Sequence, residues 1–155
     1  GLSYKPAAGG KNAVHYKAEH KGLTFQKKIS VQGESLDVSY EVTSSANGVF
    51  KVEINLAMPS CDGPAGRFVI GDHIPGGFGQ PLQWPELSRL TLEDEVLGGA
   101  LQLDVNIPCH LNTYPHFSVS QSEAGFEKIM QAVTLELSWP LNQMHGPLTI
   151  SLHVK

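Results

Sequence analysis

Apolar and polar residues alternate with a period of two along most of this chain. The alternation is clearest over residues 14–18, 23–31, 36–42, 50–58, 101–107, 133–139 and 148–154. Successive side chains of a β-strand point to opposite faces of its sheet, so each run predicts a strand with one apolar face. Such strands bury their apolar faces when two sheets pack together. The pattern therefore predicts an all-β protein, a two-sheet antiparallel β-sandwich with little helix.

Some local features refine this picture. Residues 36–42 and 50–58 flank a turn-rich segment, residues 44–48, and predict a β-hairpin. Lys27 stands at an apolar position of its run, as a strand at an edge or rim of a sheet would permit. Residues 122–133 contain several helix-favouring residues, but Gly125 interrupts them and a strand follows, so no helix is predicted there.

A long segment between the middle strands has a different composition. Residues 71–88 (GDHIPGGFGQPLQWPELS) are rich in Gly and Pro and predict a long loop. One helical turn is expected around Pro85 to Arg89. Loops of this size often carry function or cover one end of a sandwich.

Length and charge exclude several classes of protein. The 155 residues, 41% of them hydrophobic, predict one domain over residues 1–155. With 11 Lys+Arg against 15 Asp+Glu and no dense basic patch, nucleic acid is not an expected partner. No apolar run approaches the roughly 20 residues of a membrane-spanning helix, so no membrane association is expected. The start, GLSYKPAAGG, lacks the basic leader and apolar core of a signal peptide, which predicts a cytoplasmic protein. It also begins without Met, as a processed chain or a piece of a longer chain would.

The usual signatures of catalysis and metal binding do not appear. The seven histidines are scattered, and there is no CxxC pair, so neither a metal nor any other cofactor is expected. Cys61 and Cys109 favour two buried thiols over a disulfide. The acidic run Glu93-Asp94-Glu95 is interpreted as a solvated face, because nothing supplies a matched acid and base. We predict no catalytic residue in this chain.

Two tryptophans invite a carbohydrate hypothesis, because β-sandwich modules commonly hold sugars against flat aromatic rings. Trp139 continues the apolar alternation of residues 133–137 and is expected in the core. Trp84 falls in the predicted loop, where core packing and sugar stacking are equally favoured.

The stretch HFSVSQSEAGFEK, residues His116 to Lys128, contains an unusual concentration of polar side chains. Alternation places Gln121 on the same face as Phe117 and Val119, so the amide is expected to need hydrogen-bond partners at the buried side of a strand end. We interpret Gln121, Ser122, Glu123 and Glu127 as a structural and interfacial cluster, in preference to a sugar-binding site.

The same stretch carries a family resemblance. The segment SVSQSEAGFEKIMQ, followed by a strand ending in WPL, resembles the TVSQSEGGFE motif and the segment after it in the C-terminal β-sandwich domain of glycoside hydrolase family 57. That family contains α-amylases and 4-α-glucanotransferases. The preceding residues 91–117 are also similar, so the resemblance covers roughly residues 90–142. It implies a sandwich of the galactose-mutarotase type that accompanies a separate catalytic domain.

Three functions remain open on this basis. The resemblance implies a noncatalytic C-terminal domain of an α-glucan-active enzyme, with the catalytic domain of the same chain as its partner and α-glucan as a further candidate ligand. An independent carbohydrate-binding module would need Trp84 or Tyr114 exposed beside Gln121 or Glu123. A small sugar epimerase would need a His acid and a Glu base, for which His116 with Glu123 is the nearby pair.

Overall fold

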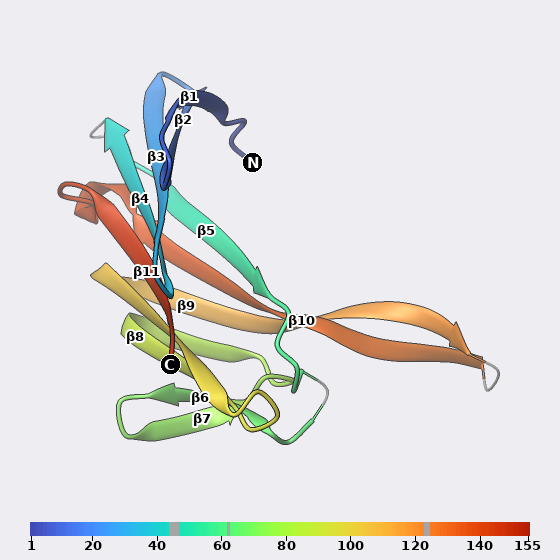
Figure 1. Cartoon of the computed structure of the whole chain (residues 1–155). Coiled ribbons are helices and arrows are strands. Elements are labelled where there is room, and N and C mark those ends of the chain that lie inside the picture. The colour runs from blue at the N-terminus through green and yellow to red at the C-terminus, as the bar shows by residue number, and fades with distance from the viewer. Residues whose placement is uncertain (44–46, 62, 123–124) are drawn as a thin grey trace.

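A computed structural model of the chain describes residues 1–43, 47–61, 63–122 and 125–155 (Figure 1). The described residues form 11 antiparallel strands and one 3₁₀ turn, which confirms the all-β fold. The elements are β1 (Lys5–Gly9), β2 (Ala13–His20), β3 (Leu23–Gln32), β4 (Ser35–Thr43), β5 (Val49–Leu56), β6 (Gly66–Ile70), β7 (His73–Gly77), β8 (Leu82–Asp94), β9 (Gly99–Ser122), β10 (Gly125–Pro140), η1 (Leu141–Gln143) and β11 (Leu148–Val154).

The strand β9 is the branch point of the sheet. The main order is β1-β2-β3-β4-β11-β9-β8-β6-β7, and β10 leaves this path to pair with β9 and β5. Residues 101–105 of β9 pair with β11, whereas residues 110–122 pair with β10. Because both partners take the same edge of β9 one after the other, the sheet divides there into two layers.

The two layers meet through aromatic side chains. The ring of Phe50 on β5 lies 6.0 Å from that of Phe25 on β3 and 5.2 Å from that of Tyr40 on β4. On its own layer, Phe50 lies beside Trp139 of β10, which is fully buried and donates an indole hydrogen bond of 2.9 Å to the carbonyl oxygen of Ile107. The prediction that Trp139 belongs to the core is therefore confirmed, and the two-layer packing is that of a β-sandwich.

The tip half of the β9–β10 hairpin projects from the sandwich as a long two-stranded arm (Figure 1). We call residues 116–122 of β9 with residues 125–131 of β10 the arm. A β-bulge between Met130 and Ala132 separates it from the base of the hairpin. At the base, Val133 to Pro140 pair with β5 on the other side, and this pairing ends where Val133 meets Leu56.

Two predictions about strand connections are wrong. Residues 36–42 and 50–58 do not form a hairpin, because β4 pairs with β3 and β11 while β5 pairs with β10. β4 and β5 instead lie in different layers; part of the predicted turn, residues 44–46, lies outside the described residues. Residues 71–88 are not one long loop, because β7 and the first half of β8 occupy most of them.

The expected helical turn around Pro85 to Arg89 is also absent from the described structure. Strand β8 continues through this segment, and its register with β9 shifts between Trp84 and Leu87 and again between Leu87 and Arg89. A bulge gives a strand a place for Pro without the loss of a ladder hydrogen bond, since the bulged residue is unpaired.

Two charged residues lie in surroundings that alternation did not predict. Lys27 is on β3, an internal strand, and its Nζ lies 5.7 Å from the ring centroid of Tyr4 and 5.5 Å from that of Tyr40. Asp94 is only 2% exposed, so the acidic run is not a fully solvated face. Its carboxylate accepts hydrogen bonds from the Ser60 amide and hydroxyl and from the amides of Val96 and Leu97.

Candidate functional site

The residues of the family-like motif lie on the arm. Gln121 pairs with Phe126, and Glu127 pairs with Ser120 across the hairpin. Ser122 ends β9 and pairs with Gly125, while Glu123 lies outside the described residues. Gln121 is exposed, so the expectation of an amide at a buried strand end is wrong. Alternation identified its face correctly, but nothing in the described chain covers that face at the tip.

The two faces of the arm differ in chemistry. Residues that pair directly across antiparallel strands point to the same side. One side therefore carries Phe117, Val119 and Phe126, and Val119 and Phe126 are 70% and 80% exposed. Lys128 pairs with Val119 on this side, and its Nζ lies 3.9 Å from the centroid of the Phe117 ring. We call these four residues, with Gln121, the apolar arm face.

The opposite side of the arm is mainly polar. It carries Ser118, Ser120 and Glu127, with Ile129 as an exposed apolar residue. His116 falls on this side by the alternation of β9 and is exposed. Since Glu123 is not described, the His116–Glu123 pair that an epimerase would need stays a prediction.

A second candidate surface lies on the outer side of β5, β10 and the middle of β9. The Tyr114 hydroxyl donates a hydrogen bond of 3.3 Å to Glu53 Oε2, and Asn55 Nδ2 donates one of 3.2 Å to Glu53 Oε1. The Thr134 hydroxyl in turn donates to Asn55 Oδ1 at 2.6 Å. Tyr114 is 40% exposed, so its ring is available to solvent beside a carboxylate and an amide.

A second carboxylate completes this surface. Glu136 lies directly opposite Glu53 in the β10–β5 register and accepts hydrogen bonds from Lys51 Nζ at 3.0 Å and from Asn112 Nδ2 at 3.2 Å. The Lys51 hydrogen bond, supported by that of Asn112, holds the pKa of Glu136 below its usual range. We call the surface formed by Lys51, Glu53, Asn55, Asn112, Tyr114 and Glu136, with the buried Thr134 beneath it, the polar face.

The chemistry of the polar face suits binding better than proton transfer. A general acid at neutral pH needs a carboxyl group with a raised pKa, and the pKa of Glu136 is lowered. The hydrogen bonds already made by Glu53 and Glu136 fix both carboxylates as acceptors. Within the described residues, no group of three or more His, Cys, Asp or Glu side chains could hold a metal ion.

The aromatic residues considered for sugar stacking are not brought together. Trp84 pairs with Leu111, whereas Tyr114 follows three residues later, so the two rings lie on opposite faces of the sheet. Trp84 is half-buried against the core, with the ring of His73 at 6.3 Å. It lies on β8 and not in a loop.

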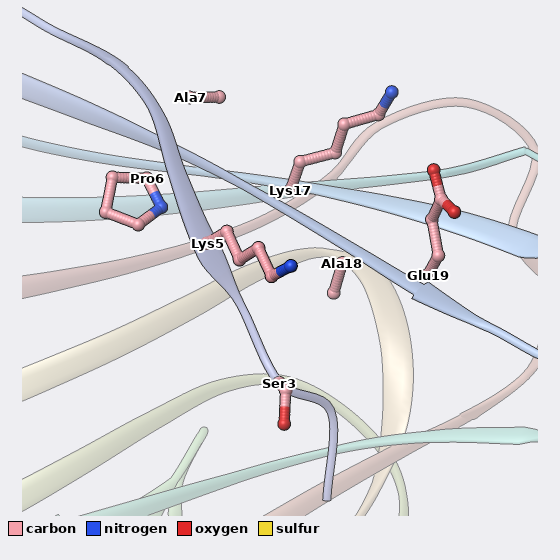
Figure 2. Close-up of a pocket in the computed structure, with 7 residues that line it drawn as sticks. All are labelled: Ser3, Lys5, Pro6, Ala7, Lys17, Ala18 and Glu19. Carbon is pink, nitrogen blue, oxygen red and sulfur yellow. The ribbon is translucent and has the colours of Figure 1, made fainter.

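The alternating pattern gave no indication of a pocket at the β1–β2 edge. This hollow, of about 510 Å³, is lined by Ser3, Lys5, Pro6, Ala7, Lys17, Ala18 and Glu19 (Figure 2). Lys5 and Lys17 pair directly across the two strands, and the nearby Glu19 offsets part of their charge. Surface lysines on an edge strand are a common protection against unwanted strand pairing, which accounts for this pair without a ligand.

Both cysteines lie in the core of the sandwich. Cys61 and Cys109 are both buried, as expected, and are not joined to each other by a disulfide in the structure. Burial raises the pKa of the Cys109 thiol to about 12. Among the described residues, no helix is long and apolar enough to cross a membrane.

The sequence matches the model of one known protein family. The family model described as "Alpha-amylase/4-alpha-glucanotransferase, C-terminal" matches residues 8–152. The chain belongs to this family. The match extends well beyond residues 90–142, which carried the recognisable motif, and includes the first half of the sandwich.

One curated protein is similar in sequence to this chain, and two solved structures are similar to it in fold. An α-amylase of Pyrococcus abyssi is 26% identical over 135 residues, which cover 86% of this chain and 18% of that enzyme. The crystal structure of the 4-α-glucanotransferase of Thermococcus litoralis matches with a TM-score of 0.66 and 19% identity, over 98% of this chain and 22% of that chain. The fold also matches that of the heparan sulfate lyase HepC of Pedobacter heparinus, with a TM-score of 0.54 and 11% identity, over 99% of this chain and 21% of that chain. This member of the C-terminal domain family therefore spans about a fifth of the length of each of these three proteins.

Proposed function

We propose that this chain is a noncatalytic C-terminal β-sandwich domain of an α-glucan-active glycoside hydrolase or glucanotransferase, and that it packs on the catalytic part of that enzyme. The observation that carries the proposal is the family match over residues 8–152, in a chain that spans only 18% of the related α-amylase. The remaining four-fifths of such an enzyme is ample for a catalytic domain.

Two of the described carboxylates, Asp94 and Glu136, are in surroundings that favour a noncatalytic role. Asp94 is buried in a ring of four hydrogen bonds that ties Ser60 to the β8–β9 turn, so it serves the fold. Glu136 is hydrogen-bonded to Lys51 and Asn112 and has a lowered pKa. Hydrolysis or transfer of a glycosidic bond needs one carboxyl group that stays protonated beside another that is ionised. Neither Asp94 nor Glu136 is suited to the protonated role.

The decisive experiment compares this chain with the longer natural protein that contains it. We expect residues 1–155 alone to fold and to show no hydrolysis or disproportionation of maltoheptaose. The longer protein should act on the same substrate. Activity in the isolated chain would overturn the noncatalytic assignment. A natural protein with no action on α-glucans would overturn the enzyme class.

Direct contact with carbohydrate is a second candidate role, and the polar face favours it. Tyr114 offers a partly exposed ring, and the neighbouring Glu53 and Asn55 are held in place by their mutual hydrogen bond. An aromatic ring flanked by fixed amide and carboxylate groups is the combination that sugar sites use.

A titration with maltoheptaose tests this second role. We expect saturable shifts of the backbone amide signals of Tyr114 and its neighbours, and their loss in Tyr114→Ala. Phe126→Ala is the matched control, because it removes another exposed ring from the far end of the same hairpin. A folded wild-type chain whose signals do not move would exclude carbohydrate contact at the polar face.

A further inference from the structure

The apolar arm face is the clearest unsatisfied surface of the described chain. Phe126 is 80% exposed, Val119 is 70% exposed and Phe117 is 36% exposed, all on one side of a two-stranded hairpin. Apolar side chains scattered singly over a surface need no explanation, but a gathered patch marks an interaction site. A two-stranded hairpin is also marginally stable by itself and gains order from packing against another surface.

This face continues the core-lining side of the sandwich. Leu111 and Thr113 of β9 are buried on the inner side, and alternation carries the same side outward to Phe117 and Val119. The pairing of β10 with its neighbour β5 stops before the arm does, since β5 ends at Leu56 opposite Val133, and beyond that point the layer is only the two strands of the hairpin wide. The inner side of the arm, with Phe117, Val119 and Phe126, therefore lies outside the hydrophobic core of this domain.

We propose that the apolar arm face docks onto the catalytic part of the same enzyme, an inference that rests on the proposed function. The occupant follows from chain length, because this chain spans 18% of its α-amylase relative and 22% of its structural relative. Most of such an enzyme lies outside the structure and is joined covalently to this domain, which gives it a high effective concentration at the arm.

The chemistry of the arm indicates the complementary surface. Phe117, Val119 and Phe126 call for apolar side chains on the catalytic part, and Lys128 calls for a carboxylate or carbonyl oxygen at the rim of the contact. A second copy of this chain fits less well, because a twofold contact through so small a face would bring two Lys128 ammonium groups close together. The polar side, with Ser118, Ser120 and Glu127, stays toward solvent.

Cysteine accessibility tests the docking with a matched pair of variants. Val119 and Ser120 are adjacent and both exposed in this chain, but they point to opposite sides of the arm. Val119→Cys and Ser120→Cys are labelled with a maleimide, first in residues 1–155 and then in the longer natural protein. Cys61 and Cys109 are 5% and 3% exposed and contribute little background while the protein is folded.

We expect both variants to react rapidly in the isolated chain. In the longer protein, Val119→Cys should react at least about tenfold more slowly, the factor for a contact worth 1.4 kcal/mol, while Ser120→Cys should keep its rate. Equal rates for Val119→Cys in the two proteins would overturn the docking inference. Protection of Val119→Cys in the isolated chain that disappears on dilution would identify a second copy as the occupant and would also overturn it.

Retention of the domain after proteolytic cleavage tests the packing on the catalytic part separately from the role of the arm. A protease site placed before residue 1 of the longer protein allows the domain to be cut away. A domain that stays bound to an α-glucan-active remainder after cleavage, with Val119→Cys unprotected, would leave the proposed packing intact and reject the arm as its surface. Retention that is lost in the double variant Val119→Ser/Phe126→Ser, but kept in Ile129→Ser, would support the arm.

Discussion

The β9–β10 hairpin has a base and an arm with similar sequence patterns and different surroundings. At the base, Leu135, Leu137 and Trp139 alternate with polar residues and are completely buried. In the arm, Val119 and Phe126 also hold alternate positions, yet they are 70% and 80% exposed. Alternation reports which side of a strand is apolar, and it does not report whether another layer covers that side.

The difference coincides with the end of a neighbouring strand. β5 pairs with the base of β10 from Val49↔Pro140 to Leu56↔Val133, and beyond that point β9 and β10 continue as a hairpin of two strands only. The base therefore serves the stability of this domain, whereas the apolar residues of the arm contribute their burial only when something else covers them. Substitutions at the two ends should separate these roles.

The largest effect is expected at the base. Trp139→Ala removes a fully buried indole and its hydrogen bond to Ile107, and should lower the free energy of unfolding by about 3–5 kcal/mol. Urea denaturation followed by circular dichroism measures this, because Trp139 itself is lost as a fluorophore. A loss below about 1 kcal/mol would mean that the base is not a close-packed core.

The buried carboxylate of Asp94 should rank next. Burial alone would raise its pKa, but hydrogen bonds from Ser60, Leu97 and Val96 outweigh burial and hold the pKa below its usual range. Asp94→Ala leaves these donors without an acceptor and should cost about 3 kcal/mol at pH 7. Glu95→Ala, one residue along, is the control and should change little.

The same lowered pKa gives this prediction a pH dependence. A carboxyl group whose pKa is lower in the folded state stabilises the fold above its unfolded pKa of about 3.9. That contribution is lost as the pH falls through the folded pKa. The stability difference between wild type and Asp94→Ala should therefore shrink below about pH 3.9. A difference that is the same at neutral and acid pH would show that the Asp94 charge is not what matters.

Substitution of a glycine should also show how closely the core of the sandwich is packed. A Cβ atom at Gly66 would lie 2.2 Å from Cδ2 of Phe78, a ring that is fully buried and packs against Phe68. Gly66→Ala must displace this ring and should cost about 2 kcal/mol. Gly79→Ala is the matched control, since a Cβ atom there meets nothing within 4 Å. Equal stability of the two variants would show that the core around Phe78 accommodates an added methyl group as easily as an open surface does.

Strands that are buried on one side were predictable from the sequence. The runs at β2, β3, β4, β5 and β11 coincide with strands, because alternation records one-sided burial directly. β7 and β8 were missed because Pro75 and Pro85 suggest loops. Pro75 lies on β7, the last strand of the sheet, and Pro85 lies where the β8 register shifts; both are places where a strand tolerates proline.

Pairing partners and the candidate surfaces required the three-dimensional structure. Tyr40 and Phe50 lie close in sequence on strands that look like a hairpin, but their rings meet across the two layers. The family-like motif located the arm, although its projection beyond β5 depends on where another strand ends. The polar face joins Glu53, Tyr114 and Glu136 from three separate strands, and no local pattern connects them.

The smallest effect is expected at the arm, and it tests the comparison most sharply. Phe126→Ser in the isolated chain removes a ring that is already 80% exposed, so the free energy of unfolding should change by no more than about 0.5 kcal/mol. Phe50→Ser is the matched substitution in the core of the sandwich. It removes a ring that lies between the layers and is only 6% exposed, and it should be severely destabilising. Urea denaturation of both variants measures the contrast. A loss above about 1 kcal/mol for Phe126→Ser would mean that the arm packs on its own domain, and the case for docking on a catalytic partner would fail with it.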